Sequence, residues 1–186
     1  MRDEELRGEE PSDLELVHRG RSGEDTALGM LVKRHHAAAY RVAVSLVRRD
    51  DVAQDVVQDA FLKAFRALAG FRADASFRTW LLTITANEAK GALRRAGRRR
   101  ETALDDAGPV VSEEMDPAEA AVVAGEASRA RGLLEGLPEK QRLSVSLRIE
   151  EGLSFKEIGE IIGSSEGAAR VNYFHGIRRL RELMNE

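Results

Sequence analysis

Apolar residues recur at spacings of three and four along most of the chain, and nowhere do they alternate for long enough to form a strand. This pattern predicts an all-α protein. Two of the predicted helix starts carry a capping-box pattern, Ser12 with Glu15 and Ser154 with Glu157. We expect helices over 13–20, 24–48, 52–68, 76–98, 117–136, 139–151, 155–162 and 166–184.

Charge divides the sequence near residue 100. Residues 87–100 carry one lysine and five arginines against one acid, whereas residues 101–128 carry eight acids and no basic residue. An acidic stretch that also contains Pro109 repels itself and is typical of a flexible linker. The sequence therefore predicts two small helical domains, over 10–100 and 128–186, joined by a flexible acidic linker over 101–127.

Composition sets outer limits on the kind of protein. With 186 residues, 42% of them hydrophobic, the chain can form real cores. The absence of cysteine excludes disulfides and thiol chemistry, and a charged N-terminus without a long apolar run predicts a cytoplasmic protein with no membrane insertion. The net charge of −3 does not itself indicate a nucleic-acid-binding protein, so that prediction depends on the local basic segment.

The predicted helix at 52–68 has one apolar and one polar face. The apolar stripe consists of Val57, Phe61, Ala64, Phe65 and Leu68, and the outward residues are Gln54, Asp55, Gln58 and Asp59. A solvated surface is the simplest interpretation of the polar face, although paired carboxylates also suit metal or acid–base chemistry. No histidine lies nearby in the sequence, so we expect no metal, cofactor or catalytic residue here.

The predicted helix at 76–98 carries the only tryptophan, Trp80, and runs into the arginines. A lone tryptophan in a small helical domain usually packs in the core. An aromatic beside cations also suits single-stranded DNA, because bases stack on rings and phosphates need positive charge. An asparagine amide can read the edge of an unpaired base. The candidate single-strand contacts are Trp80, Asn87, Lys90, Arg94 and Arg95.

A helix-turn-helix pattern spans 153–181, with a turn at Gly163. The second helix would enter the major groove of duplex DNA. We expect Arg170, Asn172 and His175 to contact the bases of the DNA, and Arg178, Arg179 and Arg181 to contact its phosphates. We expect the core of this unit to contain Ile158, Ile161, Ile162, Val171 and Ile177.

Three segments in this order resemble the extracytoplasmic-function (group IV) sigma factors of bacterial RNA polymerase. DVVQDAFLKAFRAL is similar to the polymerase-binding helix of that family, and FRADASFRTWLLTITANEAKGALRR to its −10 promoter-reading segment. LPEKQRLSVSLRIEEGLSFKEIGEIIGSSEGAARVNYFHGIRRLRELM is similar to its −35-reading domain. The resemblance covers about residues 12–184 and implies a transcription initiation factor that brings core RNA polymerase to promoters.

The resemblance also implies residue roles and partners. Asp55, Gln58 and Asp59 would contact the clamp coiled coil of the largest polymerase subunit, while the C-terminal domain would meet the flap of the second largest. Asn87 would capture a flipped −10 base, and an anti-sigma factor would be a further partner. The −35 recognition helix would include Arg170, Asn172, Phe174 and His175.

The sequence departs from the family pattern at a few positions. Thr83 replaces a basic residue and Leu82 an aromatic, both near the promoter-melting contacts, and the recognition helix has Ala168 and Ala169 where Thr and Val are usual. The resemblance therefore does not predict which −35 sequence this chain prefers.

Two other functions fit parts of the pattern. A stand-alone helix-turn-helix regulator would bind duplex DNA as a dimer, but has no need of the segment from Trp80 to Arg95. A nucleic-acid hydrolase using Asp55 and Asp59 would need a metal.

For the sigma factor, we expect weak binding of promoter duplex by the free protein, because a flexible linker does not hold the two readers at a fixed distance.

Overall fold

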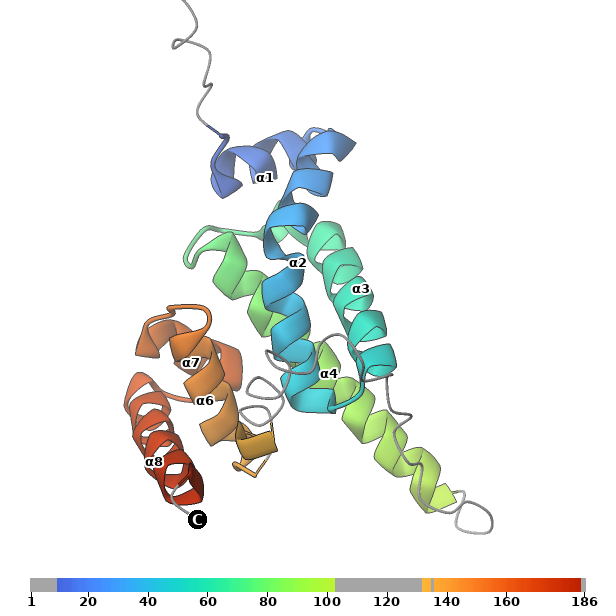
Figure 1. The fold of residues 1–186 in the computed structure, drawn as a ribbon. Helices are drawn as coiled ribbons and strands as arrows, with labels where there is room; N and C mark the ends of the chain where they lie inside the picture. The colour runs from blue at the N-terminus through green and yellow to red at the C-terminus, as the bar shows by residue number, and fades with distance from the viewer. Residues whose placement is uncertain (1–9, 103–131, 135, 185–186) are drawn as a thin grey trace, which may run out of the picture.

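The computed structural model describes residues 10–102, 132–134 and 136–184, and within these residues it contains helices and no strand (Figure 1). The N-terminal half contains α1 (Asp13–Arg21), α2 (Asp25–Val47), α3 (Asp50–Arg66), a short 3-10 helix, η1 (Leu68–Gly70), and α4 (Phe77–Thr102). The C-terminal half contains α6 (Glu139–Ile149), α7 (Phe155–Ile162) and α8 (Glu166–Met184). These bounds confirm the all-α prediction. Most of the helix predicted at 117–136, and all of the predicted linker except 101–102, lie outside the described residues.

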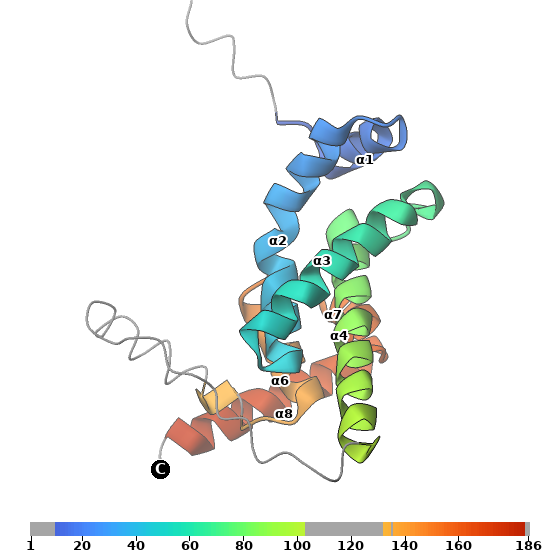
Figure 2. The same ribbon diagram turned by 90° about the vertical axis from the view of Figure 1, so that its right-hand side faces the viewer.

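Helices α2, α3 and α4 form the core of the N-terminal half, and α1 packs against α2 (Figures 1 and 2). The apolar stripe predicted on α3 is confirmed, since four of its five members are buried and Phe65 is half-buried. The chain turns from α2 into α3 at Arg48, whose φ of 56° places it in the left-handed region.

The C-terminal half is a helix-turn-helix unit preceded by α6. Ser154 and Glu157 form the predicted capping box at the start of α7, and Gly163 ends α7 with a φ of 67°, a conformation that glycine adopts without steric cost. Ile158, Ile161 and Ile162 are buried as expected. The turn also comes very close to α7 at Gly159, where an added Cβ would lie 2.9 Å from the carbonyl oxygen of Ser164.

The prediction that Val171 belongs to this core is wrong, because 54% of its surface is exposed. Helix α8 instead faces its neighbours through two small residues, Ala169 and Gly176, which are both buried. A residue two positions from Ala169 lies on nearly the opposite side of a helix with about 3.6 residues per turn. The side chain of Val171 is therefore displayed on the outer surface of α8.

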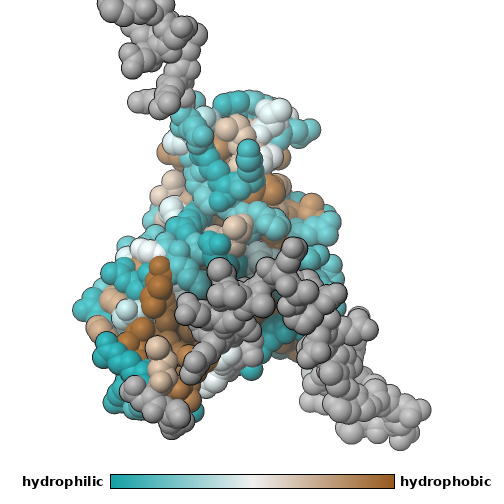
Figure 3. All heavy atoms as spheres, in the orientation of Figure 1, coloured by the Kyte–Doolittle hydropathy of each residue, from teal (hydrophilic) through white to brown (hydrophobic). Residues whose placement is uncertain are grey.

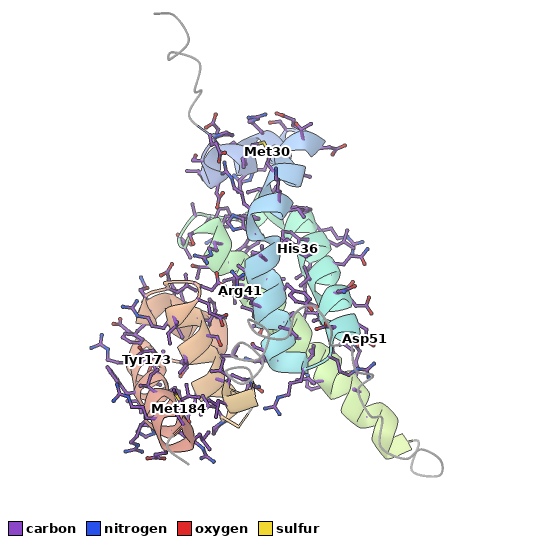
Figure 4. The ribbon with its side chains drawn as sticks, viewed as in Figure 1. Met30, His36, Arg41, Asp51, Tyr173 and Met184 are labelled. Atoms are coloured by element: carbon purple, nitrogen blue, oxygen red, sulfur yellow. The ribbon has the colours of Figure 1, made fainter. Side chains whose placement is uncertain are left out.

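The two halves also pack directly against each other, which the linker argument did not predict. Helix α7 lies against α4 and α6 lies against α2, and the buried apolar cluster is continuous across both halves. Figure 4 shows Arg41 on the side of α2 that is turned toward the C-terminal helices. The two halves are thus held together in this structure, in place of the independent arrangement that we expected.

The close approach at Gly159 generates a prediction about stability. Gly159→Ala should lower the free energy of unfolding by about 1–3 kcal/mol, because the new methyl group meets backbone atoms of the turn that have no room to yield. Gly167→Ala on α8, where the added Cβ meets nothing within 4 Å, should be neutral or stabilising by up to about 1 kcal/mol. Thermal unfolding followed by circular dichroism compares the two. Equal stability of the variants would contradict this account of the turn.

Candidate functional site

The polar face of α3 is exposed to solvent. Asp55, Gln58 and Asp59 are all exposed, as predicted. Beside them lies a groove of about 900 Å³ between α2 and α3. Figure 4 places His36, one of its lining residues, on the side of α2 that faces α3. The side chains that line the rest of the groove are mostly apolar and include Val32, Tyr40, Gln58, Phe61, Leu62 and Phe65.

Trp80 combines a structural role with partial exposure. Its ring is half-buried and lies 5.0 Å from the ring of Phe71 and 5.9 Å from that of Phe77, measured between centroids. It therefore anchors the first turn of α4 to the loop that precedes the helix. Leu82 is completely buried, and Thr83 donates a hydrogen bond to the carbonyl oxygen of Thr79.

Trp80, Asn87 and Arg94 lie on one line along α4. Each is seven residues from the next, which is close to two full turns of a helix and about 10.5 Å of rise. Asn87, Arg94 and Arg95 are exposed, while Lys90 is half-buried beside them. A ring edge, an amide and a guanidinium in a row can offer stacking, base-edge and phosphate contacts to one strand. The structure thus brings the predicted single-strand residues together on one side of α4.

The predicted duplex-reading residues on α8 divide into two groups. His175, Arg178 and Arg179 are exposed, and Phe174 is 58% exposed. Asn172 is half-buried and donates a hydrogen bond to the carbonyl oxygen of Ala168 at 2.8 Å, so its amide is engaged by its own helix. The exposed Val171 was missed by the sequence analysis, which assigned it to the core.

Arg170 is held in place by two neighbours. Its guanidinium lies 3.0 Å from the carboxylate of Glu166, and it also stacks on the ring of Phe155, 5.2 Å from the centroid. The guanidinium of Arg148 lies 5.0 Å from the same centroid. Phe155 therefore orients a cation of α8, a contact that no spacing in the sequence indicated. A cation fixed in this way loses less conformational freedom when it meets a base or a phosphate.

Figure 3 shows hydrophobic residues gathered on the surface of the C-terminal half, beside a largely hydrophilic N-terminal half. Ile149 at the end of α6 and Met184 at the end of α8 are 61% and 66% exposed.

None of the helices that the structure describes is apolar over the length needed to cross a membrane. Among the same residues, no three potential metal ligands are grouped as a metal site requires.

Comparison with known protein families matches two parts of the chain. Residues 31–99 match the family described as Sigma-70 region 2, and residues 133–182 match Sigma-70, region 4. The first match contains most of α4 and the polar face of α3, and the second contains α6, α7 and most of α8.

Relatives of similar length extend the match over nearly the whole chain. The RNA polymerase sigma-H factor of Pseudomonas aeruginosa is 33% identical, with 94% of this chain and 92% of the relative covered. The ECF RNA polymerase sigma-E factor of Escherichia coli K12 is 34% identical, with 95% and 94% covered.

Solved structures show the same architecture. The sigma factor RpoE of Bartonella quintana, solved in complex with the anti-sigma factor NepR, has a TM-score of 0.71 and 26% identity, covering 84% of this chain and 96% of its own. CnrH, solved in complex with the cytosolic domain of CnrY, has a TM-score of 0.67 and 27% identity, with 91% and 95% covered.

The packing of Trp80 predicts how substitutions there will behave. Trp80→Ala should reduce the free energy of unfolding by about 2–3 kcal/mol, because it removes the ring that packs on Phe77 and joins Phe71 of the preceding loop to α4. Trp80→Phe keeps an aromatic contact and should cost less than about 1.5 kcal/mol. Urea titration of each variant measures the difference. If Trp80→Ala were as stable as the parent chain, the ring would have no structural role.

Proposed function

The chain belongs to the extracytoplasmic-function sigma factors, transcription initiation factors that direct bacterial RNA polymerase to promoters, and we propose that its two halves read the two promoter elements separately. Residues 10–100 form the polymerase-binding and −10-reading domain, and residues 128–186 form the −35-reading domain. The observation that carries this proposal is the line of Trp80, Asn87 and Arg94 on α4, together with the exposed cations of α8. A stand-alone regulator has no use for the first of these surfaces.

The −10 element is read as melted DNA in this proposal. Asn87 receives an extruded base, because its exposed amide can both donate and accept hydrogen bonds. Trp80 offers the exposed part of its ring for stacking. Lys90, Arg94 and Arg95 neutralise the phosphates of the same strand.

The −35 element is read as duplex DNA by α8. Arg170, fixed by Glu166 and Phe155, contacts a base edge, and Phe174 and His175 extend this surface. Asn172 joins them once its amide leaves the carbonyl oxygen of Ala168. Arg178 and Arg179 lie further along the exposed helix and bind phosphates, which fix the register of the protein on the duplex.

Core polymerase binds through two surfaces. Asp55, Gln58 and Asp59 on α3 contact the clamp coiled coil of the largest subunit, a role supported by their exposure. The exposed apolar ends of α6 and α8, at Ile149 and Met184, meet the flap of the second largest subunit. The chain catalyses no reaction itself and acts in the cytoplasm, where an anti-sigma factor also binds it.

The polymerase surface is tested by charge reversal on α3. Asp55→Arg combined with Asp59→Arg should abolish co-purification with core polymerase, because two repulsive charges replace two attractive ones. The melting temperature should be nearly unchanged, since exposed substitutions usually alter stability by less than about 0.5 kcal/mol. Glu15→Arg combined with Asp25→Arg, at exposed first-turn positions of α1 and α2, is the matched control and should co-purify normally. Normal co-purification of the α3 variant would remove these residues from the interface.

The two DNA readers should separate by the step that each controls. Asn87→Ala should leave closed complexes intact and weaken open complexes by about 1–3 kcal/mol, because its amide meets only unpaired DNA. Arg170→Ala should weaken closed complexes and change the −35 preference. Arg178→Ala should weaken binding to promoters of every sequence and reduce the slope of log K against log salt by about 0.9.

Permanganate footprinting on normal duplex and on a promoter with a pre-melted −10 region distinguishes these steps. The pre-melted template should restore part of the open-complex formation that is lost in Asn87→Ala. It should restore none of the open-complex formation that is lost in Arg170→Ala. Equal loss of closed and open complexes in Asn87→Ala would show that this residue does not capture a base.

A further inference from the structure

One acid lies within the proposed −10-reading surface of α4. Residues 87–100 carry six basic side chains, and Glu88 is the only acid among them. It directly follows Asn87, the residue proposed to receive the extruded base. A carboxylate repels the phosphates of DNA, so an acid at this place works against the binding of the strand whose base Asn87 reads.

A lysine of the neighbouring helix pairs with this acid. Helix α3 packs against α4 (Figure 2). Lys63, in the last turn of α3, donates a hydrogen bond from Nζ to Oε1 of Glu88 at 2.5 Å. The side chain of Lys63 is 63% exposed, whereas that of Glu88 is only 18% exposed. The ammonium group is therefore accessible to a DNA strand, but its charge is cancelled by a carboxylate that lies mostly beneath the surface.

Two arginines of α4 converge beside this ion pair. Guanidinium nitrogens of Arg95 and Arg94 lie 3.3 Å and 3.8 Å from the point where a Cβ would stand on Gly91. Gly91 is three residues after Glu88, and residues three apart are neighbours on the surface of a helix. Cations from two helices therefore flank a single acid, and that acid neutralises one of them.

The binding of a DNA strand depends on positive charge that is not already neutralised. A cation contributes to affinity by releasing counterions from a phosphate, and each such contact changes the slope of log K against log salt by about 0.7 for a single strand. A lysine that already holds a carboxylate brings no net charge to the strand. Because phosphate contacts carry no sequence information, Glu88 lowers the affinity for every strand by the same factor.

We propose that Glu88 limits the affinity of α4 for the −10 strand by cancelling the charge of Lys63 beside Asn87. The sequence-independent part of the binding is reduced, so stable binding requires the base contact of Asn87 as well as the phosphate contacts. Promoters that lack a matching −10 base therefore stay closed. This proposal rests on the proposed function, in which α4 binds the melted −10 strand.

Four full-length chains test the proposal: the parent, Glu88→Gln, Lys63→Met and the double variant. The pair has no net charge in the parent or the double variant, a positive charge in Glu88→Gln and a negative charge in Lys63→Met. Fluorescence anisotropy measures their binding to a labelled single-stranded oligonucleotide of random sequence at several salt concentrations. At about 0.1 M salt, Glu88→Gln should bind about three-fold to ten-fold more tightly than the parent, with a slope steeper by about 0.7. Lys63→Met should bind more weakly by a similar factor, and the double variant should lie within about two-fold of the parent.

Asp51→Asn is the matched control. It breaks an ion pair of the same kind, with Arg49 at 2.5 Å, in the first turn of α3 instead of the last. This variant gains the same charge away from Asn87 and should keep the affinity of the parent within about two-fold. Glu88→Ala, which removes the same charge without adding an amide, should reproduce the result of Glu88→Gln.

Two results would overturn the proposal. One is a Glu88→Gln variant, or a Glu88→Ala variant if the former folds poorly, that binds no more tightly than the parent. The other is a double variant that binds as weakly as Lys63→Met, because Lys63 would then act on the strand independently of Glu88. Similar melting temperatures of the compared variants ensure that differences in affinity do not come from unfolding.

Permanganate footprinting with core polymerase measures the consequence at promoters. Glu88→Gln should open promoters with a mismatched −10 base about three-fold to ten-fold more than the parent does, and equal opening by the two chains would contradict this role of Glu88.

Arg94→Ala separates this proposal from the function on which it rests. If Arg94→Ala weakens strand binding while the variants of Glu88 and Lys63 change nothing, the role of Glu88 is wrong and the proposed function stands. If Arg94→Ala and Asn87→Ala both leave strand binding and promoter opening unchanged, the function proposed for α4 is wrong, whatever Glu88 does.

Discussion

Helix α4 packs against α2 and α3 on one side and against α7 on another, so its position determines both the N-terminal core and the seat of the C-terminal half. Leu81, Leu82, Ala86 and Ala89 are completely buried. The remaining surface of the helix carries Asn87, Arg94 and Arg95, which stay exposed. A single helix therefore supports the core and displays the surface that we propose binds nucleic acid, and burial of its apolar side gives that surface a fixed orientation. Trp80 adds to this by packing on Phe77 within the first turn of α4 and on Phe71 of the loop that precedes the helix.

Local features of the sequence were sufficient to predict the helices and much of the candidate site. The predicted helix starts at Ser12 and Ser154 were correct because capping depends on only three or four neighbouring residues. The outward face of α3 was predicted correctly because the helical repeat alone determines which residues share a face. Val171 was misplaced because α8 packs through small residues, Ala169 and Gly176, which carry almost no hydrophobic signal. The seven-residue line from Trp80 to Arg94 was available from spacing alone.

Contacts between the halves had no comparable signal. Arg41 and Glu151 are 110 residues apart, and Arg78 and Glu151 are 73 apart. Each is a common surface residue type, and nothing local shows that the three meet. The orientation of Arg170 by Phe155 was hidden for the same reason.

The central claim is that this chain delivers RNA polymerase to promoters by reading two elements with two separate helices. Run-off transcription with core polymerase, on a promoter library in which the spacing between the two elements is varied, tests this most directly. The account predicts transcripts that require the chain, and a yield that falls when the spacing is changed by a few base pairs from its optimum. Transcription that is the same without the chain, or that ignores the spacing and the upstream element, would contradict it.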